Sequence, residues 1–160
     1  MPRYNVLFLC TGNSSRSIMA DAILRHRGAP MFASHSAGSH PTGYVHPQAL
    51  ATIEAARLPV HGLRSKSWDE FSGPVAPRMD FIFTLCDSAA KEACPVWPGH
   101  PMTAHWGLPD PGAAPPGQLD RAFRDAFATI GRRIGLFLAL PLESLEQIAI
   151  QQRLREIGKN

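Results

Sequence analysis

The start of the chain constrains the fold more than any other feature. Residues 5–10 are almost wholly apolar, and a short run of small residues followed by a helical pattern comes directly after them. A continuous apolar run of this kind is typical of a central parallel strand that is buried on both faces. Ser14 or Ser15 can cap the helix, and apolar residues then recur at helical spacing until Gly28. A strand that leads into a helix in this way is the first unit of a layered α/β fold.

Further strands and helices alternate along the rest of the chain. We expect strands at residues 32–37, 81–85 and 102–106, and a helix that opens at Pro47 and ends before Pro59. Two more helices are predicted by the apolar stripes Leu119, Phe123, Phe127, Ile130, Ile134, Phe137 and Leu145, Ile148, Leu154. The alternation predicts a parallel sheet covered by helices on both faces. With 160 residues and no linker or repeat, we expect a single domain over residues 1–160.

Charge and cysteine content exclude several functions. Sixteen Lys and Arg against thirteen Asp and Glu give a net charge of +3, which suits a small anionic substrate but is too little to indicate nucleic acid. The longest apolar stretch, residues 134–142, is interrupted by Gly135 and Pro141, so we expect no membrane partner. Three cysteines, an odd number, do not describe a secreted disulfide framework. We therefore expect a cytoplasmic protein with free thiols.

The most specific motif is the loop between the first strand and the first helix. Cys10 and Arg16 enclose five small residues, Thr11, Gly12, Asn13, Ser14 and Ser15, and Ser17 follows. Small residues let successive backbone N–H groups turn inward to bind an anion, and the helix start adds its positive end. Arg16 can hold two oxygens of a tetrahedral oxyanion, and Gly12 and Asn13 can adopt the left-handed backbone that the loop needs. The same field is expected to lower the pKa of Cys10 and give a nucleophilic thiolate.

The simpler interpretation of this motif is a buried cysteine at a strand end and a surface arginine. Their position between a buried strand and a helix favours an oxyanion site with Cys10 as nucleophile. The loop, together with Ser36-Ala37-Gly38 and Asp110-Pro111, resembles the low-molecular-weight protein tyrosine phosphatases. Residues 84–87, Cys94-Pro95 and residues 105–107 resemble more narrowly the arsenate reductases built on that phosphatase fold.

The resemblance covers nearly the whole chain. It implies a four-stranded parallel sheet flanked by helices and a relay of three cysteines. It assigns roles as follows: Cys10 is the nucleophile, Arg16 binds the oxyanion, Asp110 is the general acid, and Cys86 and Cys94 are the redox cysteines. Asn13, Ser17 and Ser36 are expected to support the loop by hydrogen bonds to its backbone or to the Cys10 sulfur.

The relay also follows from chemistry. Arsenate resembles phosphate, so the same loop can bind it, and a second thiol that attacks Cys10 releases arsenite. A third thiol then moves the disulfide to where an external reductant can reach it. Alone, Cys86 would be a small apolar residue and Cys94 an incidental thiol, but beside Cys10 both are interpreted as redox partners.

The reductant stays open at this point. Seven residues separate Cys86 from Cys94, one more than in the best-known thioredoxin-coupled members. We therefore expect either thioredoxin or glutathione with glutaredoxin, and no tightly bound cofactor.

Other candidate residues are weaker. Flanking prolines stiffen the loop around Asp110, which would otherwise be an ordinary turn residue. The seven histidines show no metal-ligand spacing. Some relatives hold potassium with two acidic residues; Asp21 matches the first, the second is not placed, and no metal is predicted. We interpret His105 as a packing residue, and Trp68, Trp97 and Trp106 as packing or lid residues.

Two other functions compete with arsenate reduction. The first is phosphotyrosine hydrolysis, which needs only Cys10, Arg16 and Asp110. Phosphatases of this fold usually carry an aromatic residue directly after the Asp-Pro, and Gly112 stands there in this chain. The second is an oxyanion sensor that binds without turnover, against which the intact Asp110 argues.

The segment between the two later cysteines is expected to change conformation. Residues 87–93 are rich in helix formers, and a helix would separate Cys86 from Cys94 by roughly 12 Å along its axis. A disulfide needs Cα atoms within about 7 Å, so its formation would unwind part of this helix.

Overall fold

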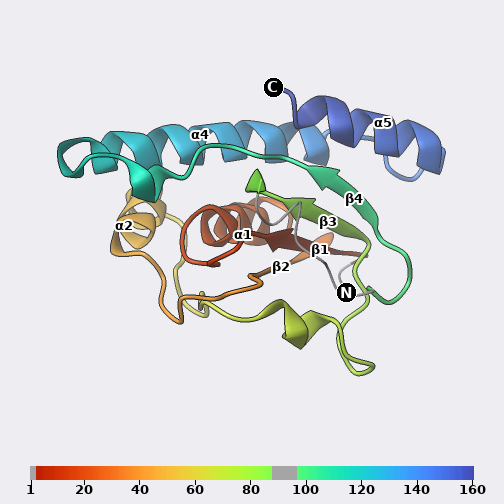
Figure 1. The fold of residues 1–160 in the computed structure, drawn as a ribbon. Coiled ribbons are helices and arrows are strands. Elements are labelled where there is room, and N and C mark those ends of the chain that lie inside the picture. The colour runs from red at the N-terminus through yellow and green to blue at the C-terminus, as the bar shows by residue number, and fades with distance from the viewer. Residues whose placement is uncertain (1–2, 88–96) are drawn as a thin grey trace.

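The four strands form one parallel sheet. The computed structural model describes residues 3–87 and 97–160 (Figure 1). Its strands are β1 (Tyr4–Leu9), β2 (Phe32–Ala37), β3 (Phe81–Thr84) and β4 (Met102–His105), in the order β2-β1-β3-β4. All three pairings are parallel, which confirms the predicted sheet and its central first strand. Because parallel strands end at a common edge, the residues that follow β1 and β3 and those that end β4 gather there.

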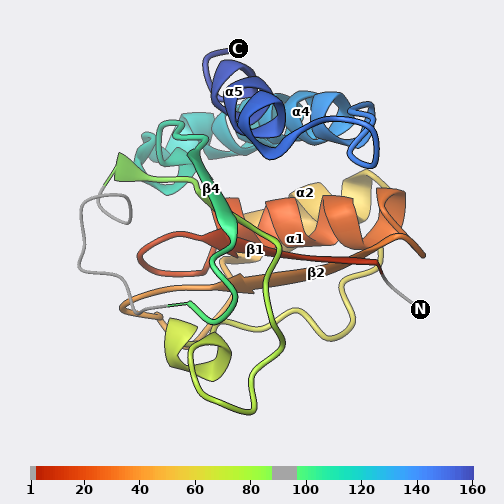
Figure 2. The same ribbon diagram turned by 90° about the vertical axis from the view of Figure 1, so that its right-hand side faces the viewer.

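The helices cover the two faces of the sheet unequally. The described α-helices are α1 (Arg16–Arg27), α2 (Pro47–Ala55), α4 (Leu119–Leu138) and α5 (Gln147–Ile157). Figure 2 shows them stacked on one side of the strands, with the 3-10 helix η1 (Trp68–Phe71) on the opposite side. Two further 3-10 helices, η2 (Pro111–Ala113) and η3 (Pro116–Gln118), lead into α4. Within the described part of the chain, no helix has the length and apolar character needed to span a bilayer.

Side chains alternate between two apolar layers, which explains the apolar run in β1. Phe8 and Phe83 face the helices, where the Phe83 ring stacks on Trp106 with centroids 3.8 Å apart. Leu7 and Leu9 face the other layer, against which Trp68 and Trp97 pack. Trp106 is fully buried, as a packing residue should be.

Several local predictions need correction. Ser15 is the N-cap residue of α1, but its side chain makes no capping hydrogen bond. Leu145 precedes α5, and Ile148 is exposed, so the buried face of α5 consists instead of Ile150, Leu154 and Ile157. All of the predicted helix over 87–93 except Asp87 lies outside the described residues, and so does Cys94.

Candidate active site

Two cysteines meet at the carboxyl edge of the sheet. Cys10 directly follows β1, and Cys86 lies two residues beyond β3. Neighbouring β1 and β3 are in register at Leu9 and Thr84, and Leu85 N–H donates to the Leu9 carbonyl at 2.8 Å. The Cys10 and Cys86 side chains are therefore in contact and hydrogen-bonded, and each is buried. The structure brings the predicted nucleophile and the first of the two predicted redox thiols together.

The loop that follows Cys10 has its carbonyls turned outward. Backbone N–H groups from the segment 40–46 donate to the carbonyls of Thr11, Gly12 and Ser14 at 2.9–3.0 Å. The N–H groups of the same peptide units point the opposite way, as an anion-binding loop requires. Asn13 adopts the expected left-handed backbone with φ of 45°, whereas Gly12 does not.

The Asn13 side chain bonds to Ser17 and Lys66, not to the loop backbone or the Cys10 sulfur as expected. Its amide Nδ2 donates to Ser17 Oγ at 2.8 Å, and its Oδ1 accepts from the Lys66 backbone N–H at 2.9 Å. Asn13 and Ser17 are both fully buried. Because these bonds satisfy both ends of the Asn13 amide, they fix the strained residue in place.

Gly38 makes the close packing of the loop possible. A Cβ at this position would lie 2.4 Å from the Thr11 carbonyl oxygen and 2.7 Å from that of Cys10. The residue also joins the segment before η1, because its N–H donates to the Lys66 carbonyl at 2.9 Å. The Ser-Ala-Gly motif therefore ends in glycine for a steric reason.

Gly38→Ala is expected to distort the loop. Overpacking against backbone atoms should lower the free energy of unfolding by about 1–3 kcal/mol. Bound phosphate should protect Cys10 from alkylation, and we expect this protection to be weaker in the variant. Urea unfolding and alkylation with added phosphate measure the two effects. Gly73→Ala is the matched control, since a Cβ there meets nothing within 4 Å, and equal behaviour of the two variants would contradict the prediction.

Ser36 reaches the loop only through Lys66, which corrects the prediction of a direct hydrogen bond. Its hydroxyl donates to Asp21 Oδ2 at 3.0 Å and accepts from Lys66 Nζ at 3.3 Å. Asp21 is fully buried and forms an ion pair with Arg25 at 3.1 Å. Burial lowers the pKa of Lys66, while Asp21 opposes that shift. Lys66 carries no signal in the sequence, because its contact with Ser36 depends on packing between distant segments.

Arg16 connects the loop to the segment that carries Asp110. Its Nη1 donates to the Leu108 carbonyl at 2.9 Å. Its Nε is buried and has no hydrogen-bond partner among the described residues. A buried donor normally has an acceptor, and an oxyanion in the loop would supply one.

An open cavity of about 730 Å³ lies in front of these groups. It is lined by Thr11, Arg16, Cys86, Asp87, His105, Gly107, Leu108, Pro109, Asp110 and Gly158. The predicted acid Asp110 is exposed, and its Oδ1 accepts from the Gly112 N–H at 2.9 Å. The cavity thus unites a guanidinium, a thiol and a carboxyl group from three separate segments. Among the residues that the structure describes, no three His, Cys, Asp or Glu side chains are grouped as a metal site would need.

The prediction of a lowered pKa for Cys10 is wrong for this state of the protein. The hydrogen bond with Cys86 and burial raise the pKa of the Cys10 thiol above its ordinary value. Arg16 and the backbone N–H of Thr11 act in the opposite direction but do not outweigh them. The prediction considered the loop alone, whereas the neighbouring thiol belongs to a segment 76 positions further along the chain.

Cys86→Ala is expected to lower the pKa of Cys10, because it removes the main cause of the upward shift. The alkylation rate of Cys10 should then reach its half-maximum at a lower pH than in the parent protein. Mass spectrometry of Cys10 in a Cys94→Ser background measures this without interference from the third thiol. An unchanged or higher midpoint would contradict the assigned cause.

Two more residues hold segments beside the cavity, and the sequence indicated neither role. His105 is not a packing residue: its side chain is 41% exposed and hydrogen-bonds to Asp87 and Thr84. Arg133, on the buried side of α4, donates from Nη1 to the carbonyls of Trp106 and Gly107 at 2.7 and 3.1 Å. A lone arginine in an apolar stripe gave no signal of this role.

The comparisons with known proteins agree with this geometry. The model of the family described as low molecular weight phosphotyrosine protein phosphatase matches residues 5–150. An arsenate reductase of Shouchella clausii is 32% identical over 139 residues, which cover 86% of this chain and 96% of that protein. A solved arsenate reductase in the phosphate-binding state is 27% identical with a TM-score of 0.66, covering 85% of this chain and 97% of that one. A thioredoxin-dependent arsenate reductase of Corynebacterium glutamicum shares the fold, with 22% identity and a TM-score of 0.62 over 89% of this chain and 64% of that one.

Proposed function

The chain belongs to the low molecular weight phosphotyrosine protein phosphatase family, and within that family we propose that it reduces arsenate to arsenite. The observation that carries the proposal is the contact between the buried thiols of Cys10 and Cys86. Ester hydrolysis needs one thiol in the loop, whereas a two-electron reduction needs a second thiol within reach of the first. The arsenate reductase relative at 32% identity and the oxyanion-binding geometry support the same conclusion.

The first step joins Cys10 to arsenic. In this step the bound arsenate dianion takes up the proton of the Cys10 thiol. The Cys10 sulfur then attacks arsenic, a sulfur–arsenic bond forms, and one arsenic–oxygen bond breaks. Arg16 and the loop N–H groups stabilise the oxygens, and Asp110 protonates the departing hydroxide to water.

The second step carries the redox change. The Cys86 sulfur attacks the Cys10 sulfur, a disulfide forms, and the sulfur–arsenic electron pair stays on arsenic, which becomes arsenite. Each sulfur loses one electron, arsenic gains two, and the Cys86 proton passes to an arsenite oxygen. Thr11 Oγ1 lies 3.5 Å from Cys86 Sγ and can hydrogen-bond to that sulfur as it reacts.

The last steps restore the loop. Cys94 attacks the Cys86 sulfur, and Cys10 leaves as a thiolate. An external dithiol then reduces the Cys86–Cys94 disulfide, and thioredoxin or glutathione with glutaredoxin supplies it. Because the cycle depends on free thiols, it belongs in the cytoplasm, where such systems keep thiols reduced.

One assay tests the function. The purified protein is incubated with arsenate and, separately, with p-nitrophenyl phosphate, each with thioredoxin and its reductase or with glutathione and glutaredoxin. Steady arsenite production with one of these systems supports the proposal. Hydrolysis of the phosphate ester without arsenite would make the protein a phosphatase, and oxyanion binding without either product would make it a sensor.

A further inference from the structure

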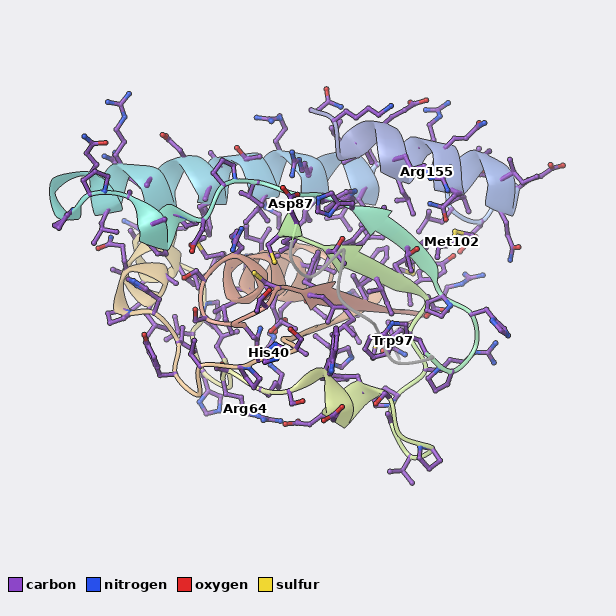
Figure 3. The ribbon with its side chains drawn as sticks, in the orientation of Figure 1. His40, Arg64, Asp87, Trp97, Met102 and Arg155 are labelled. Atoms are coloured by element: carbon purple, nitrogen blue, oxygen red, sulfur yellow. The ribbon has the colours of Figure 1, made fainter. Side chains whose placement is uncertain are left out.

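A histidine at the cavity rim bridges the two sides of Cys86. His105, the last residue of β4, pairs through Nε2 with Asp87 Oδ1 at 2.9 Å. Its other ring nitrogen, Nδ1, lies 2.8 Å from Thr84 Oγ1. Thr84 precedes Cys86 by two positions and Asp87 follows it directly, so one imidazole ring holds both sides of the cysteine. We call these contacts of Thr84, His105 and Asp87 the His105 bridge. Figure 3 labels Asp87, which lies beyond the carboxyl end of β3.

The His105 bridge extends the attachment of β3 to β4. Thr84 and His105 are partners in the strand register, and Trp106 N–H donates to the Thr84 carbonyl at 2.7 Å. Leu108 N–H donates to the Leu85 carbonyl at 3.2 Å. The pairing of His105 with Asp87 continues this attachment past Cys86. The segment that carries the thiol is therefore held before and after the sulfur.

Both bonds survive a change in the charge of the imidazole. An ionised carboxylate only accepts hydrogen bonds, so Nε2 carries the hydrogen toward Asp87. The Thr84 hydroxyl can donate to Nδ1 when the ring is neutral and accept from it when the ring is protonated. The His105 bridge is therefore a geometric device in either charge state.

Gly107 leaves the space that the bridge occupies. A Cβ there would lie 2.4 Å from His105 Nε2 and 3.2 Å from Asp87 Oδ1. Any other residue would displace the pair. Asp87, His105 and Gly107 line the same cavity as Arg16, so the bridge stands at the site where the thiols react.

We propose that His105 is a positioning residue that sets the Cys86 sulfur against Cys10 for disulfide formation. The arsenate part of this inference rests on the proposed function, while the geometric part concerns the two thiols alone. Attack of one sulfur on another requires the two sulfur atoms to be closely aligned. A small displacement of the Cys86 turn should therefore slow disulfide formation strongly. Loss of the bridge should slow the second step more than the first.

The test compares His105→Ala and Asp87→Ala with the control His61→Ala, an exposed histidine distant in sequence, all in a Cys94→Ser background. One arm measures arsenite released in a single turnover. A second arm measures Cys10–Cys86 disulfide formation with diamide, which takes up the two electrons and two protons of the thiols. A third arm measures hydrolysis of p-nitrophenyl phosphate. We expect disulfide formation in both bridge variants to fall at least about tenfold more than hydrolysis, and His61→Ala to match the parent.

Each outcome decides the inference. Unchanged disulfide rates, or equal falls in disulfide formation and hydrolysis, would overturn it. Slow disulfide formation with diamide, in a protein whose parent releases no arsenite, would support positioning and refute the proposed function. If His105→Ala does not fold, two other variants give the same comparison. These are Asp87→Ala, whose parent side chain is 82% exposed, and Gly107→Ala.

Discussion

Cys10→Ser is expected to abolish arsenate reduction and phosphate-ester hydrolysis together. A serine hydroxyl in the same loop is a far weaker nucleophile and cannot form a disulfide, so both rates should fall at least about a thousandfold. Arg16→Ala should act in the same direction, because the oxygens then lose the guanidinium that faces the cavity. Initial rates with arsenate and with p-nitrophenyl phosphate measure both losses.

Folding must be preserved for this result to count. Cys10→Ser changes one buried atom, so its urea unfolding curve should stay close to that of the parent, and Arg57→Ala, an exposed arginine after α2, serves as the matched control for Arg16→Ala. Retention of either activity in well-folded Cys10→Ser would contradict the assignment of the nucleophile.

Cys86→Ala is expected to separate the two activities. Multiple-turnover arsenate reduction should fall at least about a hundredfold, because no thiol remains against Cys10 to release arsenite. Hydrolysis of a phosphate ester uses Cys10, Arg16 and Asp110 and should persist. Cys94→Ala should show the same split, since it blocks the transfer of the disulfide.

The comparison of the two rates in the same variant preparation makes this result robust. A variant that folds poorly loses both rates in proportion, whereas loss of the relay removes only one. Equal losses of both activities in the Cys86 and Cys94 variants would mean that these thiols are structural.

The features that sequence predicted well are local ones. The apolar run of β1, the small residues after it and the start of α1 are adjacent in the chain, so their order alone indicates the strand, the loop and the helix. The redox role of Cys86 followed from the resemblance and from the chemistry of the relay. The left-handed Asn13 was predictable, because asparagine tolerates that backbone better than most residues.

The features that sequence missed depend on contacts between distant segments. Lys66 meets Ser36 across 30 positions, and Arg133 reaches the Trp106 carbonyl across 27. His105 had no distinctive pattern, and its role became visible only when β4 placed it beside Asp87. The raised pKa of Cys10 has the same origin, because its main cause is the Cys86 thiol rather than the loop in which Cys10 stands.

The central claim is that Cys10 and Cys86 together supply the two electrons that reduce arsenate. The most direct measurement uses the Cys94→Ser variant, reduced, freed of thiol reductant and mixed with excess arsenate. Arsenite is quantified, and the disulfides are mapped by mass spectrometry. The account predicts one arsenite per protein molecule, with two thiols lost and a Cys10–Cys86 disulfide formed in equal amount. Arsenite formed without that disulfide, or no arsenite from a folded protein that binds arsenate, would contradict it.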